Sequence, residues 1–268
     1  MNDHELYHWG IKGMKWGVRR YQNKDGTLTP AGRIRYAEVS DKKIVTNSDG
    51  SRVVPKDFVF NRVGKNSMDV NESGALYVSY GERDAARYVK NLGPTLIGNL
   101  FNTSAHYVQH IKTKGELKIP SDDETVSLTI DSVMKNRDIF YSFKDSLYSM
   151  IATDDPLKEI SMKDIEKAFS SDNKKEKWKM AYAINSMLGD PYYANESKKI
   201  YDEFRKNGYD AIPDLHDQFS GTSETAMIVI NPEKLLITST VEISKDVQKE
   251  AKNYVKLMEK LPISELIN

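Results

Sequence analysis

The sequence contains no cysteine, which excludes a disulfide framework, a thiolate metal site and a cysteine nucleophile. Lysine and arginine together number 39, and so do aspartate and glutamate, so the formal net charge is zero. Bulk charge therefore favours neither nucleic acid nor a membrane, and nucleic acid is a possible but not a favoured partner. No run of about 18 apolar residues occurs, and the start lacks the pattern of a signal peptide. We expect a soluble, intracellular protein that does not engage a membrane.

The 268 residues are enough to bury a sizeable core, and the pattern divides them into three parts. Residues 1–39 are rich in tryptophan and basic side chains and are interpreted as a docking segment. Residues 40–243 mix strand and helix patterns and form the main domain, which we predict to be α+β. Residues 244–268 begin with a charged helical pattern and are interpreted as a C-terminal helix.

Residues 58–89 carry the clearest pattern of the main domain. The β-branched and aromatic run at residues 58–63 predicts a strand, and residues 75–80, between two glycines, predict a second strand. From Glu82 the apolar residues recur at helical spacing, so a helix follows at once. Arg62 and Ser79 then lie near the ends of two strands, and Tyr88 lies on the helix. This arrangement can hold a phosphate together with an aromatic ring. The alternative is a core element whose arginine is merely solvated.

The rest of the chain is interpreted element by element from periodicity and turn signals. We predict strands at residues 44–45, 53–54, 116–119, 209–214, 226–230 and 239–243, and helices at 96–110, 125–152, 161–169, 174–188, 196–206 and 245–260. His106 and His110 are four residues apart on the predicted helix, a spacing that suits a metal ion. Because no third ligand is near in sequence, a plain amphipathic helix is favoured and no metal site is predicted.

Glu224 follows the polar loop at residues 215–223 and precedes the apolar strand at 226–230. A carboxylate at the mouth of a buried strand is well placed to meet a substrate hydroxyl. The plainer interpretation is a surface glutamate that begins a strand.

Residues 7–36 place two of the three tryptophans among glycines and basic residues and have no clear period. The aromatics can stack on bases, plug a pocket on a partner, or pack on the main domain. The segment Tyr-His-Trp-Gly-Ile-Lys-Gly-Met-Lys-Trp-Gly-Val-Arg-Arg-Tyr, with the residues that follow to Tyr36, resembles one found in head-associated proteins of tailed bacteriophages and prophages. That resemblance implies a phage or prophage origin and attachment to a phage structural protein.

The order of the pieces in residues 55–243 resembles the ADP-ribosyltransferase superfamily, in its divergent mobile-element members. The pieces are an early strand arginine, the Tyr-Val-Ser strand with its Ala-Ala-x-Tyr helix, the run Gly-Tyr-Asp-Ala-Ile, and Ser-Glu before an apolar strand. The resemblance implies a split, mixed β-sheet with surrounding helices. It also implies NAD as the substrate.

Carried over to this sequence, the resemblance makes Arg62 the phosphate-binding arginine and Ser79 the serine that supports the ribose. Tyr88 is the candidate for stacking on the nicotinamide, Tyr77 and Tyr80 flank the serine in the cofactor site, and Glu224 is the catalytic carboxylate. A carboxylate suits the positive charge that develops when a glycosidic bond breaks. The sequence departs from the family at Val78-Ser79-Tyr80, which stands where the family usually has Ser-Thr-Ser, and at Thr222, where modifying enzymes carry Glu or Gln.

The expected function is transfer of ADP-ribose from NAD to a host macromolecule, or hydrolysis of NAD. A phage protein with this activity would act in the bacterial host cytoplasm and could be carried there in the virion. A first alternative is a non-catalytic protein that is virion-associated or binds a host factor. A second alternative is a protein that sequesters an NAD-derived nucleotide. An intact pocket in which Glu224 points away would favour that alternative.

Overall fold

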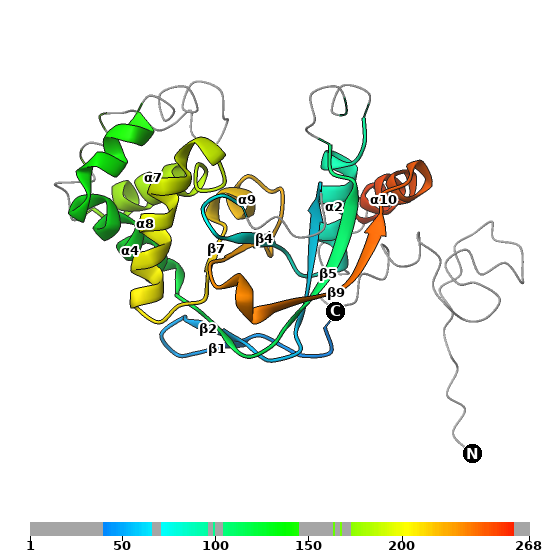
Figure 1. Ribbon diagram of the computed structural model, residues 1–268, viewed down its shortest axis with the longest axis horizontal. Helices are drawn as coiled ribbons and strands as arrows, with labels where there is room; N and C mark the ends of the chain where they lie inside the picture. The colour runs from blue at the N-terminus through cyan, green and yellow to red at the C-terminus, as the bar shows by residue number, and fades with distance from the viewer. Residues whose placement is uncertain are drawn as a thin grey trace, which may run out of the picture.

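The computed structural model describes residues 40–65, 71–95, 99, 104–144, 163, 167 and 173–259. The expected docking segment and nearly all of the predicted helix at 161–169 lie outside these residues. Within them the fold is α+β, as predicted: short antiparallel sheets lie between two groups of helices (Figure 1). No helix among them is both long and apolar enough to cross a membrane.

The strands form three small sheets. Their order is β1-β2-β6, β3-β5-β9 and β4-β8-β7. The bounds are β1 Val45–Thr46, β2 Arg52–Val54, β3 Val59–Gly64, β4 Leu76–Val78, β5 Tyr107–Thr113, β6 Leu117–Ile119, β7 Ala211–Pro213, β8 Met227–Val229 and β9 Leu235–Glu242. Every pairing between these strands is antiparallel, which differs from the mixed sheet that we expected. The predicted hairpin is present as β1 and β2.

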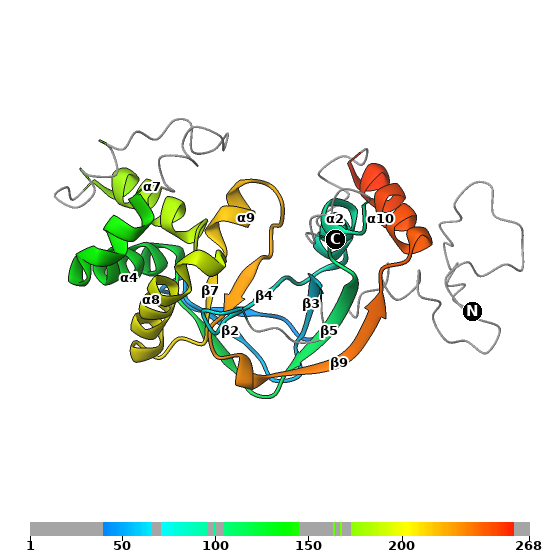
Figure 2. The same ribbon diagram turned by 45° about the horizontal axis from the view of Figure 1, so that its top comes forward.

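The helices form two groups on opposite sides of the sheets (Figures 1 and 2). Their bounds are α2 Glu82–Leu92, α4 Asp122–Lys135, α7 Lys174–Asn185, α8 Ala194–Lys206, α9 Leu215–Phe219 and α10 Lys245–Met258, with short 3-10 helices η1 Pro191–Tyr193 and η2 Pro232–Lys234. Helices α2 and α10 lie together near β3, β5 and β9, while α4, α7 and α8 lie together on the other side. Helix α9 lies between the two groups.

The predicted helix at residues 96–110 is wrong at its C-terminal end. Residues 107–113 form β5, the central strand between β3 and β9. The aromatic and β-branched residues Tyr107, Val108 and Ile111 suit a strand, and the pairing partners on both sides fix it. His110 therefore lies on a strand, where its Nδ1 atom forms a 2.7 Å hydrogen bond with Oγ of Ser239.

Two further expectations need correction. The segment at residues 215–223 was expected to be a loop, but it begins with the five-residue helix α9. Asp214 caps this helix, since its carboxylate accepts the backbone N–H of Asp217 at 3.1 Å. The last strand was expected at 239–243, but β9 begins at Leu235 and spans the whole edge of β5.

Three clusters of buried side chains hold the elements together. The largest lies among α4, α7 and α8, with Tyr182, Tyr201 and Phe204 almost inaccessible to solvent. A second fills the space between the sheets, around Phe60 and Ile111. A third joins α2 and α10 to β5 and β9. Each cluster joins elements that are distant in sequence, so long-range contacts hold the sheets and the two helix groups in place.

Candidate functional site

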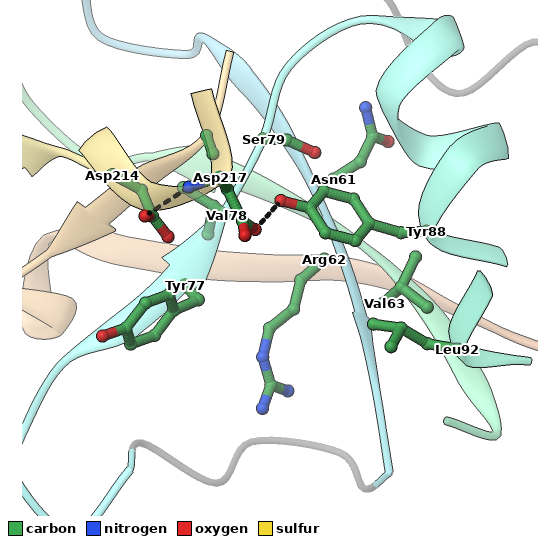
Figure 3. A pocket seen from close by; sticks show the side chains of 11 residues that line it. Asn61, Arg62, Val63, Tyr77, Val78, Ser79, Tyr88, Leu92, Asp214 and Asp217 are labelled. Carbon is green, nitrogen blue, oxygen red and sulfur yellow. Dashed lines mark hydrogen bonds between the residues drawn. The ribbon is translucent and has the colours of Figure 1, made fainter. Parts of the chain in front are cut away.

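A pocket of about 200 Å³ opens where β3, β4, α2 and α9 meet (Figure 3). Strands β3 and β4 belong to different sheets and touch through a single bridge, in which Asn61 and Ser79 exchange backbone hydrogen bonds of 2.7 and 2.9 Å. The pocket lies at this junction of two sheets. Its lining residues are Asn61, Arg62, Val63, Tyr77, Val78, Ser79, Tyr88, Leu92, Asp214, Asp217 and Ala226.

Four of the six residues that the sequence nominated line this pocket together: Arg62, Tyr77, Ser79 and Tyr88. They come from β3, β4 and α2, and the fold brings them to one place. The helix α2 begins directly after β4 because Gly81 adopts a φ of 101°, which side-chain-bearing residues rarely do. This tight turn carries Tyr88 back over the end of β4.

Arg62 is positioned by its own sheet. Its Nη1 atom donates a 2.8 Å hydrogen bond to Oε1 of Gln109, the residue opposite it on β5. Gln109 is only 1% exposed, so the guanidinium group is anchored by a fixed side chain. A Cβ atom at Gly64 would lie 3.1 Å from Cζ of Arg62, so glycine leaves room for this arginine.

Asn61 and Ser79 face each other across the bridge and are both buried, at 1% and 2% exposure. Asn61 was not predicted from the sequence as a site residue. Its side-chain Nδ2 and Oδ1 atoms are closed off from solvent and have no hydrogen-bond partner among the residues described. A buried amide whose donors and acceptor all lack hydrogen-bond partners lowers the stability of the folded protein.

Two aromatic hydroxyl groups belong to the pocket. The Tyr88 hydroxyl donates to Oδ2 of Asp217, and burial together with the neighbouring carboxylate raises the pKa of Tyr88. The Tyr77 hydroxyl lies 3.5 Å from that of Tyr201, and burial raises the pKa of Tyr77 well above its usual value. Both phenols therefore stay protonated and act as neutral hydrogen-bonding groups.

Asp214 and Asp217 are the carboxylates of the pocket, and neither was predicted from the sequence as a site residue. Asp214 is 4% exposed, and burial, with the charge of Asp217 beside it, raises the pKa of Asp214 to about 7. Asp214 therefore keeps its proton up to nearly neutral pH, because burial and the neighbouring negative charge both disfavour its ionised form. The spacing Asp-x-x-Asp after a strand is a helix-start signal that could have located them.

Glu224 does not line the pocket. Its side chain is 63% exposed and forms ion pairs with Arg83 at 3.0 Å and with Arg87 at 3.7 Å, both on α2. Its neighbours on either side point inward instead. Oγ of Ser223 and the backbone N–H of Thr225 donate to Oδ2 of Asp84, at 2.7 and 3.0 Å. This alternation holds Glu224 outward, so the plainer interpretation of this glutamate as a surface residue at a strand start fits the structure.

Tyr80 is also outside the pocket. Its ring packs edge-on against Phe58 and Phe60, at centroid distances of 5.5 and 6.4 Å, within the cluster between the sheets. Tyr80 therefore supports the strand from behind and does not face a ligand.

A second hollow of about 470 Å³ adjoins the pocket and shares Tyr77, Asp214 and Asp217 with it. Its other walls come from the end of α7 and the segment before η1, at Asn185, Ser186, Gly189, Asp190 and Pro191, and from His216. A Cβ atom at Gly189 would lie 3.0 Å from the Tyr77 hydroxyl, so this glycine permits the close approach. The two hollows give the site room for a ligand longer than one ring.

Among the residues described, no group of three His, Asp or Glu side chains is arranged to hold a metal ion. The comparisons with known proteins reach only the start of the chain: residues 1–23 match a family of unknown function (DUF7211). No curated protein and no solved structure matches the chain.

Proposed function

We propose that the chain binds an NAD-type nucleotide in the pocket of Arg62, Ser79 and Tyr88, on a split sheet of the ADP-ribosyltransferase type. The observation that carries the proposal is the convergence of Arg62, Tyr77, Ser79 and Tyr88, from three elements, on one pocket at the junction of two sheets. Because Glu224 points away from this pocket, binding is better supported than catalysis by that residue.

The chemistry of the lining suits such a nucleotide. A guanidinium group presents a fork of donors that matches a pyrophosphate, and Arg62 is held in place by Gln109. Tyr77 and Tyr88 offer aromatic surfaces, and Ser79 offers a hydroxyl group. Ligand pockets usually measure about 300–1,000 Å³. The pocket alone, at about 200 Å³, is small for a dinucleotide, so the ligand would extend into the adjoining hollow of about 470 Å³.

Calorimetric titration of the purified protein with NAD and with ADP-ribose tests this proposal. Arg62→Ala should weaken the binding of both ligands at least about tenfold, because the charge-assisted hydrogen bonds to phosphate are lost. The matched control is Arg83→Ala, since Arg83 lies outside the pocket and pairs with Glu224. The proposal fails if wild-type protein binds neither nucleotide, or if the two variants weaken binding equally.

A second candidate function is the transfer of ADP-ribose to a host macromolecule, or hydrolysis of NAD, by a phage protein in the bacterial cytoplasm. What favours it is a carboxylate that does line the pocket, Asp217, which can stabilise the positive charge of a breaking glycosidic bond. Nicotinamide release, measured with and without host lysate, should then be lost in Asp217→Asn and kept in Glu224→Gln. Release that is lost in Glu224→Gln and kept in Asp217→Asn would return the catalytic role to Glu224. If no protein releases nicotinamide, the protein binds the nucleotide without cleaving it.

A further inference from the structure

The pocket has opposite charges on its two sides. Figure 3 shows the Arg62 guanidinium group on one side and the carboxylates of Asp214 and Asp217 on the other. Among the described residues that line the pocket or the adjoining hollow, Arg62 is the only arginine or lysine. A ligand that complements this pocket therefore carries an anionic part near Arg62 and a cationic or hydroxyl-rich part near the carboxylates.

Among the described residues, no arginine or lysine forms an ion pair with Asp214 or Asp217. Asp217 accepts the Tyr88 hydroxyl, which is a neutral donor. His216 Nδ1 lies 3.5 Å from Oδ1 of Asp217 and adds a positive charge only when the imidazole is protonated. Asp214 is 4% exposed and accepts the backbone N–H of Asp217 at its helix cap. A buried carboxylate without a cationic partner is unfavourable in a folded protein, and an arriving cation would relieve it.

A second, independent feature of the same pocket points to a polar ligand. Asn61 is 1% exposed, and both of its amide atoms are unpaired among the residues described. Its amide offers two donors and one acceptor group, which a primary carboxamide can match. The nicotinamide ring of NAD carries a carboxamide, and in its oxidised form it also carries a positive charge.

We infer that Asp217, supported by Asp214, is the specificity-determining carboxylate of this pocket and selects the oxidised, positively charged nicotinamide ring over the reduced, neutral ring. The inference rests on the proposed function, because it takes the ligand to be an NAD-type nucleotide. Asp217 acts here as a binding group, and no bond is made or broken.

The protonation of Asp214 adds a pH dependence to this selectivity. The titratable groups that face Asp214 come from three helices and one strand: Asp217 and His216 of α9, Tyr88 of α2, Tyr201 of α8 and Tyr77 of β4. Since its pKa is raised to about 7, Asp214 gains its negative charge as the pH rises through neutrality. The affinity for the oxidised ring should rise over that range, whereas the affinity for the reduced ring should not.

The test compares the dissociation constants of NAD, NADH and ADP-ribose, which lacks the nicotinamide ring. Wild-type protein should bind NAD roughly tenfold or more tightly than NADH, the size expected for one close charge pair at an intermediate dielectric. In Asp217→Asn this preference should disappear while ADP-ribose binding changes less than about twofold. The matched control is Asp123→Asn, a carboxylate on α4 whose side chain is 87% exposed.

A further variant tests whether the carboxamide of the nicotinamide ring meets Asn61, while the NAD and NADH affinities of the wild-type protein test the charge selection itself. Asn61→Leu removes the unpaired amide at similar volume, so the thermal midpoint should hold or rise. NAD binding should nevertheless weaken more than ADP-ribose binding. Equal affinities of wild-type protein for NAD and NADH would overturn the inference, as would a preference that survives in Asp217→Asn. Binding of no nucleotide at all would instead overturn the proposed function.

Discussion

The segment from Asp214 to Thr225 holds carboxylates in two contrasting environments. At its start, Asp214 and Asp217 face inward and line the pocket, with Asp214 4% exposed. Near its end, Glu224 faces outward with 63% of its side chain exposed and pairs with arginines of α2. The carboxylate that the sequence motif nominated is the exposed one, and the two carboxylates that it passed over are the ones that line the pocket. Side-chain direction, rather than residue type, separates them.

The largest loss of stability should come from replacing Asp84, whose hydrogen bonds keep Glu224 pointing away from the pocket. Asp84 is 3% exposed and accepts hydrogen bonds from Oγ of Ser223 and from the backbone of Thr225. Asp84→Ala removes the buried acceptor of both bonds and leaves the buried Ser223 hydroxyl without it, so the free energy of unfolding should fall by about 3–5 kcal/mol. Urea denaturation measures this loss. The exposed Asp131→Ala on α4 is the control, and a loss as small as in that control would show that these hydrogen bonds are unimportant.

An intermediate effect on the free energy of unfolding should come from Asp214, the buried carboxyl group at the start of the segment. The pKa of Asp214 is about 7 in the folded protein, above the usual 3.8, so the folded state binds the extra proton between those values. This carboxyl group therefore costs no stability below about pH 4 and destabilises the fold progressively as the pH rises toward 7. Wild-type protein should lose about 2–3 kcal/mol from this group between about pH 5 and about pH 8.

Asp214→Asn keeps a side chain that caps α9 but cannot ionise. Its unfolding free energy should change less with pH than that of wild-type protein over the same range. Chemical denaturation at several pH values provides the measurement. Parallel curves for the two proteins would show that Asp214 does not carry the pH dependence.

The smallest effect should come from Glu224 itself. Exposed ion pairs contribute about 0–1 kcal/mol, so Glu224→Gln should lower the free energy of unfolding by no more than about 0.5 kcal/mol. NAD affinity should also stay the same, because the side chain does not reach the pocket. A clear loss of affinity would bring Glu224 back into the site and remove the contrast between the two environments.

Local residue patterns predicted the strands and the helix on which most of the pocket residues lie. The run at residues 58–63 became β3, residues 75–80 became β4, and the helix after Gly81 became α2. Each of these has a strong period and a clear start or stop signal. By contrast, α9 has five residues, too few to show a period, and only its cap at Asp214 marks it.

The error at residues 96–110 has a different cause. The amphipathic pattern at residues 96–110 favours a helix, yet residues 107–113 form a strand because β3 and β9 pair with both of its edges. Those partners lie far away in sequence, and pairing on two sides outweighs weak local preference.

The sequence by itself determined the balance of charge, the strand–turn–helix unit around Ser79 and the presence of Arg62 near the end of β3, because these depend on composition and on neighbours in the chain. Only the tertiary structure decided which side chains share the pocket. Asp84 binds Ser223 across 139 positions and turns Glu224 outward, while Asp217 accepts the Tyr88 hydroxyl across 129 positions. Contacts of this kind depend on how distant elements pack, and no local pattern encodes their direction.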